Sequence, residues 1–186
     1  MTPARLILAS QSPRRRELLT QAGYRFDVLP ADIDETRQQG EAPAAYVQRL
    51  ALEKAQAIAA LHPSCYVLGA DTTVVLDGEV LNKPVDAAEA ERMLRALSGR
   101  THQVHTGIAV ATSMSARSHV ETTSVFFGAI AEDELAHYLS TGDSLDKAGA
   151  YGIQGYAARW ITRIEGDFFN VMGLPIAATV RLLAGV

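Results

Sequence analysis

Short apolar runs and helical apolar stripes alternate along the whole chain. Runs of about four to eight apolar residues are typical of buried strands, and apolar residues at three- and four-residue spacing are typical of amphipathic helices. Strands are predicted at residues 6–9, 26–29, 66–70, 73–76, 80–81, 101–111, 119–127 and 160–164. Helices are predicted at residues 13–21, 43–61, 86–98, 132–139 and beyond Pro175. Because the two kinds of element are interspersed, the pattern predicts a mixed α/β fold.

Local signals mark where some of these elements begin and end. Ser12 and Pro13 are typical of the N-cap and the first residue of a helix. Asp77-Gly78 is typical of a tight hairpin turn. Asp71 directly follows the apolar run 66–70 and is expected to end that strand. Ligands of open α/β sheets bind outside such strand ends, which makes Asp71 a candidate site residue.

Length and composition suggest an ordinary soluble protein. The 186 residues contain no repeat or linker, so a single domain over residues 1–186 is expected. No apolar run approaches the roughly 20 residues of a membrane span, and residues 6–9 are too short for the core of a secretory signal. The single cysteine, Cys65, excludes an intrachain disulfide and fits a reducing compartment. We therefore expect a cytoplasmic protein without a membrane partner.

The net charge of the chain bears on which binding partners are expected. The formal net charge is −4, whereas nucleic-acid-binding domains typically carry a broad basic surface. Nucleic acid is therefore not an expected partner. Any polyanion that binds should be small and held by a local basic cluster.

The segment Ser10-Gln11-Ser12-Pro13-Arg14-Arg15-Arg16-Glu17 is the first such cluster. It leads from a predicted strand into a helix N-terminus, where free N–H groups and the helix dipole favour an anion. Arginine can bind phosphate through two parallel hydrogen bonds. Ser10, Arg14 and Arg15 are therefore candidate phosphate ligands. The alternative is an exposed basic helix face that Ser12 caps.

Lys54 and two acidic groups form a second set of candidates. Lys54 lies on the apolar stripe of its helix, so it either extends past the edge of the core or meets an anion. Asp71 could hold a divalent metal ion or take a proton from water, and a turn-forming role is the alternative. Glu35 belongs to the acidic segment 32–35 after the second strand, where solvated loop charges are the alternative.

The second half of the chain adds Lys83 and a glycine-rich segment at residues 147–155. Lys83 could contact phosphate, and an ordinary loop lysine is the alternative. Gln154 could read a base edge through its paired donor and acceptor groups, and a plain flexible loop is the alternative. His102 and His105 should face opposite sides of a strand, so they do not suggest a shared metal ion. Two basic and two acidic clusters without a nucleophile-activating triad suit metal-assisted attack of water on a phosphoryl group.

The order of several short motifs resembles that of the Maf family. The matching segments spread over nearly the whole chain and are LASQSPRR at 8–15, GADT at 69–72, KP at 83–84, LSGRTH at 97–102, DKAGAYGIQG at 146–155 and GLP at 173–175. The resemblance implies an elongated mixed central sheet flanked by helices, with two lobes and a cleft, similar to inosine triphosphate pyrophosphatases. It implies hydrolysis of a nucleoside triphosphate to the monophosphate and pyrophosphate with Mg²⁺ or Mn²⁺, as part of the house-cleaning of nucleotide pools.

The resemblance also implies roles for individual residues. The implied catalytic residues are Asp71, Glu35, Lys54 and Lys83, and Asp71 and Glu35 would also hold the metal ion. The implied substrate ligands are Ser10, Arg14, Arg15, Thr72 and Gln154. Within that set, Arg14, Thr72 and Gln154 match the branch of the family that prefers dTTP and UTP. Asn82 departs from the pattern, because many relatives carry Gly or Glu before the Lys-Pro pair. Members of the family are often homodimers.

Two other functions are compatible with the sequence. One is a nucleotide-binding regulator of septum formation and cell division without significant turnover, although the complete set of acidic and basic residues argues against it. The other is the same chemistry on 7-methyl-GTP or a modified nucleotide. The branch that prefers 7-methyl-GTP commonly carries Trp where this chain has Arg14, and the run 150–154 differs there.

Overall fold

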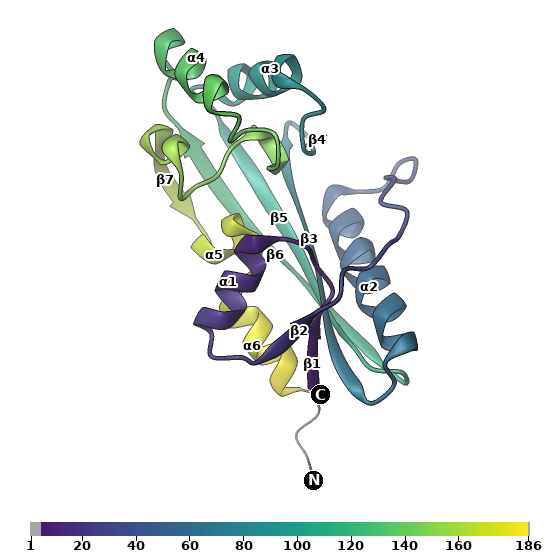
Figure 1. The fold of residues 1–186 in the computed structure, drawn as a ribbon. Coiled ribbons are helices and arrows are strands. Elements are labelled where there is room, and N and C mark those ends of the chain that lie inside the picture. Colours follow the sequence, from purple (N-terminus) through teal and green to yellow (C-terminus); the bar gives the residue numbers. More distant parts are fainter. Residues whose placement is uncertain (1–4, 186) are drawn as a thin grey trace. The chain divides into compact units, whose positions relative to one another are not determined.

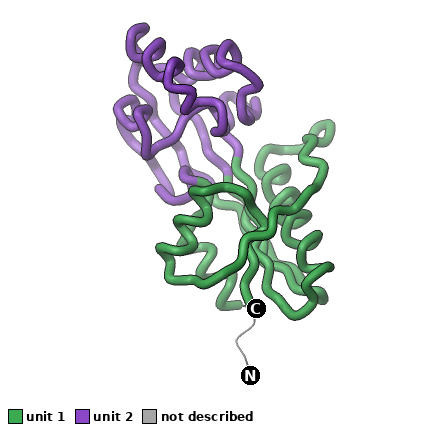
Figure 2. The backbone as a smooth tube through the Cα atoms, in the orientation of Figure 1, with its two compact units in different colours: residues 1–72, 106–121, 173–186 green, residues 73–105, 122–172 purple. Residues whose placement is uncertain are grey.

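The computed structural model describes residues 5–185, and these divide into two compact units (Figure 2). Unit 1 comprises residues 5–72, 106–121 and 173–185, and unit 2 comprises residues 73–105 and 122–172. Residues 1–4 and 186 of the expected single domain lie outside the described residues. That expectation of one domain stays a prediction.

The strands of unit 1 include a parallel trio near the N-terminus. β1 (Arg5–Leu8) pairs in parallel with β2 (Phe26–Val28) and with the first part of β3 (Cys65–Leu76). Unit 1 also holds the end of β5 (Thr101–Ala111) and the start of β6 (Ala116–Phe127). The predicted strands at these places are confirmed, although β6 begins three residues before the predicted start at 119.

Helices lie on both sides of these strands. α2 (Pro43–Leu61) lies on one side, and α1 (Pro13–Gln21) and α6 (Ile176–Ala184) lie on the other (Figure 1). The backbone of α2 approaches the strands closely at Gly69 and Gly107, where a Cβ atom would lie 2.2 Å from a carbonyl oxygen of the helix. The two glycines therefore set how closely α2 packs on β3 and β5.

Local chemistry explains why α1 begins where it does. The Ser12 hydroxyl accepts a hydrogen bond from the backbone N–H of Arg15 at 3.4 Å, and Pro13 occupies the first helical position. Proline there loses no intrahelical hydrogen bond, because the first N–H groups of a helix have no partner within it. The bounds predicted for this helix are confirmed.

Unit 2 holds two further strands and several short helices. Asp77 and Gly78, both with positive φ, form the tight turn between β3 and β4 (Glu79–Leu81). β7 (Ile161–Glu165) pairs antiparallel with β6. The helical elements are α3 (Ala87–Leu97), α4 (Glu132–Thr141), η1 (Ala148–Ala150), η2 (Tyr156–Trp160) and α5 (Phe168–Met172). The sequence pattern did not predict α5.

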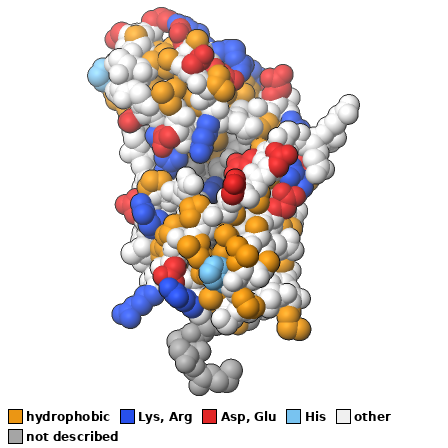
Figure 3. Space-filling model, turned by 45° about the vertical axis from the view of Figure 1, so that its right-hand side comes forward, with side chains coloured by type: hydrophobic (Ala, Val, Ile, Leu, Met, Phe, Trp, Pro, Cys, Tyr) orange, Lys and Arg blue, Asp and Glu red, His pale blue; other side chains and the backbone are white. Residues whose placement is uncertain are grey.

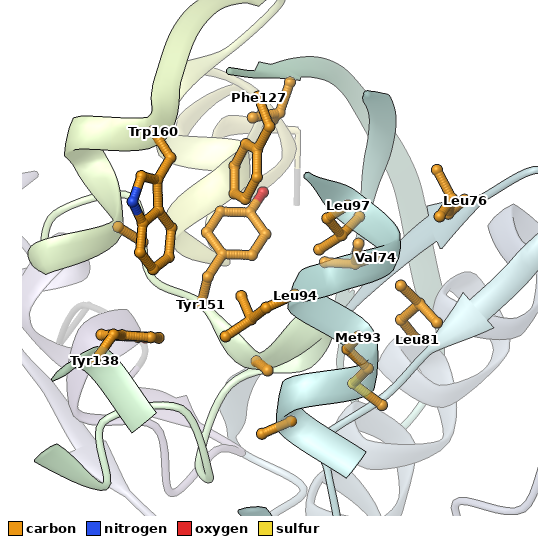
Figure 4. Packing of buried hydrophobic residues seen from close by; sticks show 14 of the residues in the cluster. Val74, Leu76, Leu81, Met93, Leu94, Leu97, Phe127, Tyr138, Tyr151 and Trp160 are labelled. Carbon is orange, nitrogen blue, oxygen red and sulfur yellow. The ribbon is translucent and has the colours of Figure 1, made fainter. Parts of the chain in front are cut away.

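The core of unit 2 is rich in aromatic side chains. Figure 4 shows Phe127, Tyr151 and Trp160 gathered beside Leu94 and Leu97 of α3. The rings of Phe127 and Tyr151 meet edge to face with their centroids 4.8 Å apart. Such pairs add stabilisation beyond the burial of their area, so this core fixes the segment that carries Tyr151.

Among residues 5–185 the strands form a seven-stranded mixed sheet in the order β2-β1-β3-β5-β6-β7, with β4 paired to β3. The predicted mixed sheet flanked by helices is thus confirmed. The prediction that Asp71 ends a strand is wrong, because β3 runs unbroken from Cys65 to Leu76. Thr72 and Thr73 are β-branched and favour extended backbone, and the Asp71 carboxylate has a charged partner, so nothing breaks the strand there.

No helix within residues 5–185 is both long and apolar enough to cross a membrane. On the face drawn in Figure 3, basic side chains lie among acidic ones, and the described residues form no continuous basic area on that face. The expectation that nucleic acid is not a partner stays a prediction.

Candidate functional site

Lys54 lies between two carboxylates in unit 1. Its ammonium nitrogen is 2.8 Å from Oδ1 of Asp71 and 2.8 Å from Oε1 of Glu35. Lys54 is only 7% exposed, whereas the Glu35 side chain is 57% exposed. Lys54 therefore does not simply extend past the core into solvent. It meets two anions of the protein itself and brings two of the predicted catalytic carboxylates within reach of one ammonium group.

The packing of α2 explains this arrangement. Ala51 and Ala55 lie against Gly69 of β3, where the absent side chain lets the helix backbone approach. Side chains of a strand alternate between its two faces, so Asp71 shares the α2 face with Gly69. Lys54 lies within the same turn of the helix. Its aliphatic stem is buried with that packing, and its ammonium group reaches Asp71.

Arg15 forms a second cluster at the N-terminus of α1. Its Nε donates to the Gly173 carbonyl at 2.8 Å, Nη1 donates to the Ser10 hydroxyl at 3.1 Å, and Nη2 donates to the Thr72 hydroxyl at 3.0 Å. The Thr72 hydroxyl is in turn 2.9 Å from that of Thr106. Three of the predicted substrate ligands, Ser10, Arg15 and Thr72, are therefore brought together.

Electrostatics link the two clusters. Burial lowers the pKa of the Arg15 guanidinium, the charges of Asp71 and Glu35 raise that pKa, and the charge of Arg14 lowers it. Interactions between charges weaken with distance, so Asp71, Glu35 and Arg14 all lie close enough to Arg15 to affect its charge. Asp71 and Thr72 are successive residues of β3, and β1 pairs with β3 only as far as Leu68. The two clusters thus meet where β1 has ended.

The carboxylates of Asp71 and Glu35 suit a divalent metal ion of a particular kind. Among residues 5–185 no three His, Cys, Asp or Glu side chains form a group that could hold a metal ion. Mg²⁺, however, is commonly held by only one or two carboxylates, with water and substrate phosphates completing its shell. The two oxygens on either side of Lys54 fit a metal that is bound together with a phosphorylated substrate.

The remaining predicted site residues belong to unit 2. Lys83 is exposed and follows β4, and Gln154 is exposed between η1 and η2. Asn82 receives a hydrogen bond from the Gly149 backbone at 3.2 Å and another from the Thr73 hydroxyl at 3.3 Å. Asn82 therefore ties the segment before Lys83 to the glycine-rich segment. The roles of Lys83 and Gln154 stay predictions.

Sequence reasoning missed several residues of the site. Thr106 contacts Thr72, yet a threonine within a strand carries no chemical signal of its own. Gly173 accepts a hydrogen bond from Arg15, and although its GLP motif is part of the family resemblance, the sequence assigned it no role in the site. Tyr46 and Arg49 of α2 contact the loop of Glu35, but their periodicity is that of any amphipathic helix. Only the position of Tyr46 on the same predicted helix as Lys54 could have suggested that Tyr46 lies near the site.

The chain is similar to proteins of one family over nearly its whole length. The family model described as "Maf-like protein" matches residues 5–186. The chain is 53% identical to a dTTP/UTP pyrophosphatase of Koribacter versatilis, over 97% of this chain and 95% of the relative. It is 50% identical to a dTTP/UTP pyrophosphatase of Vibrio cholerae, over 98% of both chains. A third dTTP/UTP pyrophosphatase, from Symbiobacterium thermophilum, is 52% identical over 96% of this chain and 92% of the relative.

Solved structures with a similar fold are more distant in sequence. A HAM1 protein from Coxiella burnetii superposes with a TM-score of 0.55 at 16% identity, over 98% of this chain and all of the other (100%). The Staphylococcus aureus Ham1 protein superposes with a TM-score of 0.50 at 18% identity, over 66% of this chain and 71% of the other. At such identities the likeness bears on the fold alone.

Proposed function

The chain belongs to the Maf family, and from that premise we propose that it is a nucleoside triphosphate pyrophosphatase acting on dTTP and UTP. The products are the nucleoside monophosphate and pyrophosphate. The relatives named dTTP/UTP pyrophosphatase support this choice, because they are about half identical over nearly the full chain. Removal of these nucleotides from the cellular pool, in the cytoplasm, is the role that we propose.

The observation that carries the proposal is the position of Lys54 between Asp71 and Glu35, next to the Arg15 cluster. A pyrophosphatase needs a group that accepts a proton from water and cations that neutralise phosphate. In the proposed reaction, the water oxygen forms a bond to the α-phosphorus while Asp71 takes the proton. The bond from the α-phosphorus to the bridging oxygen breaks, and its electron pair leaves with pyrophosphate.

The basic residues stabilise charge during this step. Arg15 is oriented by three hydrogen bonds, so a phosphate that binds at the start of α1 meets a guanidinium with a fixed direction. Donors that are oriented in advance need not reorganise as charge develops on the phosphate oxygens. Arg14 lies beside Arg15 in the chain and is proposed to bind the same triphosphate. Lys54 holds the two carboxylates at a fixed separation.

Mg²⁺ or Mn²⁺ is the proposed cofactor. Asp71 and Glu35 would hold it, and it would supply positive charge to the phosphate oxygens. Lys83 is proposed as a further phosphate ligand. Preference for dTTP and UTP is assigned to Arg14, Thr72 and Gln154 on the resemblance to that branch of the family. A homodimer is likewise a proposal.

The experiment that tests the function is pyrophosphate release from dTTP, UTP, CTP, GTP and 7-methyl-GTP with Mg²⁺, with Mn²⁺ and with chelator. The proposal predicts turnover that requires metal and is concentrated on dTTP and UTP. Turnover concentrated on 7-methyl-GTP would leave the chemistry intact and contradict the assigned substrate. Nucleotide binding without turnover would favour a regulator instead.

The role of Asp71 has its own test in the substitution Asp71→Asn, which keeps the shape of the side chain. The value of kcat for dTTP should fall by about 10²–10⁴-fold, the usual contribution of a positioned general base. Asp27→Asn is the matched control, because Asp27 pairs with Arg5 at the surface of the same unit. The control should keep the wild-type rate, and a wild-type rate in Asp71→Asn would contradict the assignment.

A further inference from the structure

The loop that carries Glu35 has no regular secondary structure, yet α2 holds it at two successive residues. Residues 29–38 form neither helix nor strand. The Tyr46 hydroxyl donates to the Glu35 carbonyl at 2.9 Å, and Nη2 of Arg49 donates to the Thr36 carbonyl at 3.1 Å. Two donors from one helix therefore fix the backbone at Glu35 and at the residue that follows it.

Arg49 is itself held firmly. Its Nε and Nη2 donate to the two oxygens of Glu41 at 2.7 and 2.9 Å, which is the paired geometry that favours an arginine–carboxylate contact. Nη1 donates to Glu53, one turn further along α2. The Arg49 and Glu41 side chains are only 19% and 9% exposed. Because this ion pair is partly shielded from water, it orients Arg49 more strictly than an exposed pair would.

The far end of the loop is hydrogen-bonded to the same residue, Glu41. Oε2 of Glu41 accepts a hydrogen bond from the backbone N–H of Gln38 at 3.1 Å, and Nε of Arg37 donates to the Glu41 carbonyl at 2.9 Å. Glu41 precedes α2 by two residues. Hydrogen bonds to Arg49 and Glu41 thus connect the loop after Glu35 to the first turns of α2 and to the residues just before it.

The Glu35 carboxylate itself lies at the surface. Its side chain pairs with Lys54 but is more than half exposed, so close packing does not hold it in place. A carboxylate on an exposed irregular loop otherwise samples many positions. Lys54 lies about two helical turns after Tyr46 on the same helix. One rigid element therefore fixes both the ammonium group and the backbone of the carboxylate that pairs with it.

We infer that Tyr46 and Arg49 are positioning residues that hold Glu35 beside Lys54 and Asp71, an inference that rests on the proposed function. Neither side chain is assigned a contact with substrate. Their effect passes through the position of the Glu35 carboxylate. Loss of either donor should therefore slow the chemical step and leave nucleotide binding nearly unchanged.

The first test compares kcat and KM for dTTP in Tyr46→Phe, Arg49→Met and Arg49→Lys. Misplacement of a catalytic group by about 1 Å can cost up to ~100-fold in rate, so a fall in kcat of about 10-fold or more is expected with little change in KM. Tyr46→Phe removes only the hydroxyl and keeps the buried ring, so it should fold. Gln48→Met is the matched control, because Gln48 of the same helix bonds to Ser118 and not to the loop.

The second test repeats Arg49→Met in the background Glu35→Gln. If Arg49 acts through Glu35, the second substitution should add no further loss of kcat, because residues that act as a unit are not additive. Independent losses that multiply would overturn the inference. So would wild-type kcat in both Tyr46→Phe and Arg49→Met.

Hydrogen exchange separates this inference from the proposed function. Amides of residues 31–42 should exchange faster in Tyr46→Phe and Arg49→Met, while those of α2 keep their protection. Absence of turnover in the wild-type protein would contradict the proposed function, and loop exchange alone would then decide the inference. Unchanged exchange of the loop in both variants would overturn it.

Discussion

Lys54 shows how one residue can serve the fold and the site together. Its stem lies in the packing between α2 and β3, and its ammonium group is shared by Asp71 and Glu35. A lysine that is 7% exposed is stable in its charged form only when it is paired. The same requirement applies to Asp71, which projects from the middle of a strand. Each of the two charges therefore depends on the other.

The substitution Lys54→Met should reveal this dependence. It keeps the length of the stem and leaves Asp71 without its cation, so the free energy of unfolding should fall by about 1–3 kcal/mol. Urea unfolding measures the change. Arg5→Met, which breaks an exposed ion pair with Asp27, is the control and should change stability by no more than about 0.5 kcal/mol. Equal stability of Lys54→Met and wild type would show that the buried charge of Asp71 does not depend on Lys54.

His102 gives a prediction about pH. Its side chain is 2% exposed, and burial lowers its pKa from 6.5 to about 4. Nε2 is 2.7 Å from the Tyr151 hydroxyl, while Nδ1 has no hydrogen-bond partner among residues 5–185. The protonated ring carries an N–H group at both nitrogens, and the described chain offers no acceptor for the one at Nδ1. The folded protein therefore holds His102 neutral.

Between pH 6.5 and about 4 the unfolded chain binds a proton at His102 that the folded chain does not. The free energy of unfolding should therefore fall as the pH drops through this window, by up to about 3 kcal/mol from this residue. The contribution of His102 to the free energy of unfolding is fully present above pH 6.5. Urea unfolding of His102→Gln at several pH values should show a shallower decline. His137→Gln, at an exposed position, should keep the wild-type decline, and an equally steep decline in His102→Gln would refute the prediction.

At the scale of elements, the contact of α2 with the strands determines the geometry of the site. A Cβ atom at Gly107 would lie 2.2 Å from the Val47 carbonyl oxygen. Gly107→Ala should therefore push the helix from β5 and lower the free energy of unfolding by about 3 kcal/mol. Thermal unfolding and kcat should both report the shift, because α2 carries Lys54. Gly128→Ala is the control, since its new atom would lie 3.4 Å from the nearest heavy atom, and equal stability of the two variants would contradict this view.

Element bounds were predictable from sequence where a specific local interaction sets them. Ser12 and Pro13 define the start of α1, and Asp77-Gly78 defines the hairpin of β3 and β4. The prediction that a strand ends at Asp71 was wrong, because a polar residue after an apolar run is typical of a strand end. Its partner Lys54 is 17 residues away, and only tertiary packing brings the two together. α5 is five residues long, too short for its periodicity to be detected.

At the scale of the whole molecule, the motifs indicated the chemistry but not the distances. Asp71, Glu35 and Lys54 were each recognisable from the family resemblance. Their meeting at 2.8 Å follows from the packing of α2, which no single motif encodes. The same holds for Arg15, whose contact with Gly173 spans 158 residues of sequence. Lys83 and Gln154 lie in the other unit, so their roles still rest on resemblance.

In the proposed reaction, water attacks the α-phosphorus of the nucleotide. Turnover of dTTP in H₂¹⁸O, followed by mass spectrometry of both products, tests it most directly. Attack at the α-phosphorus should place the heavy oxygen in dTMP and leave pyrophosphate unlabelled. Label in pyrophosphate would mean attack at the β-phosphorus and would contradict the mechanism assigned to Asp71 and its neighbours.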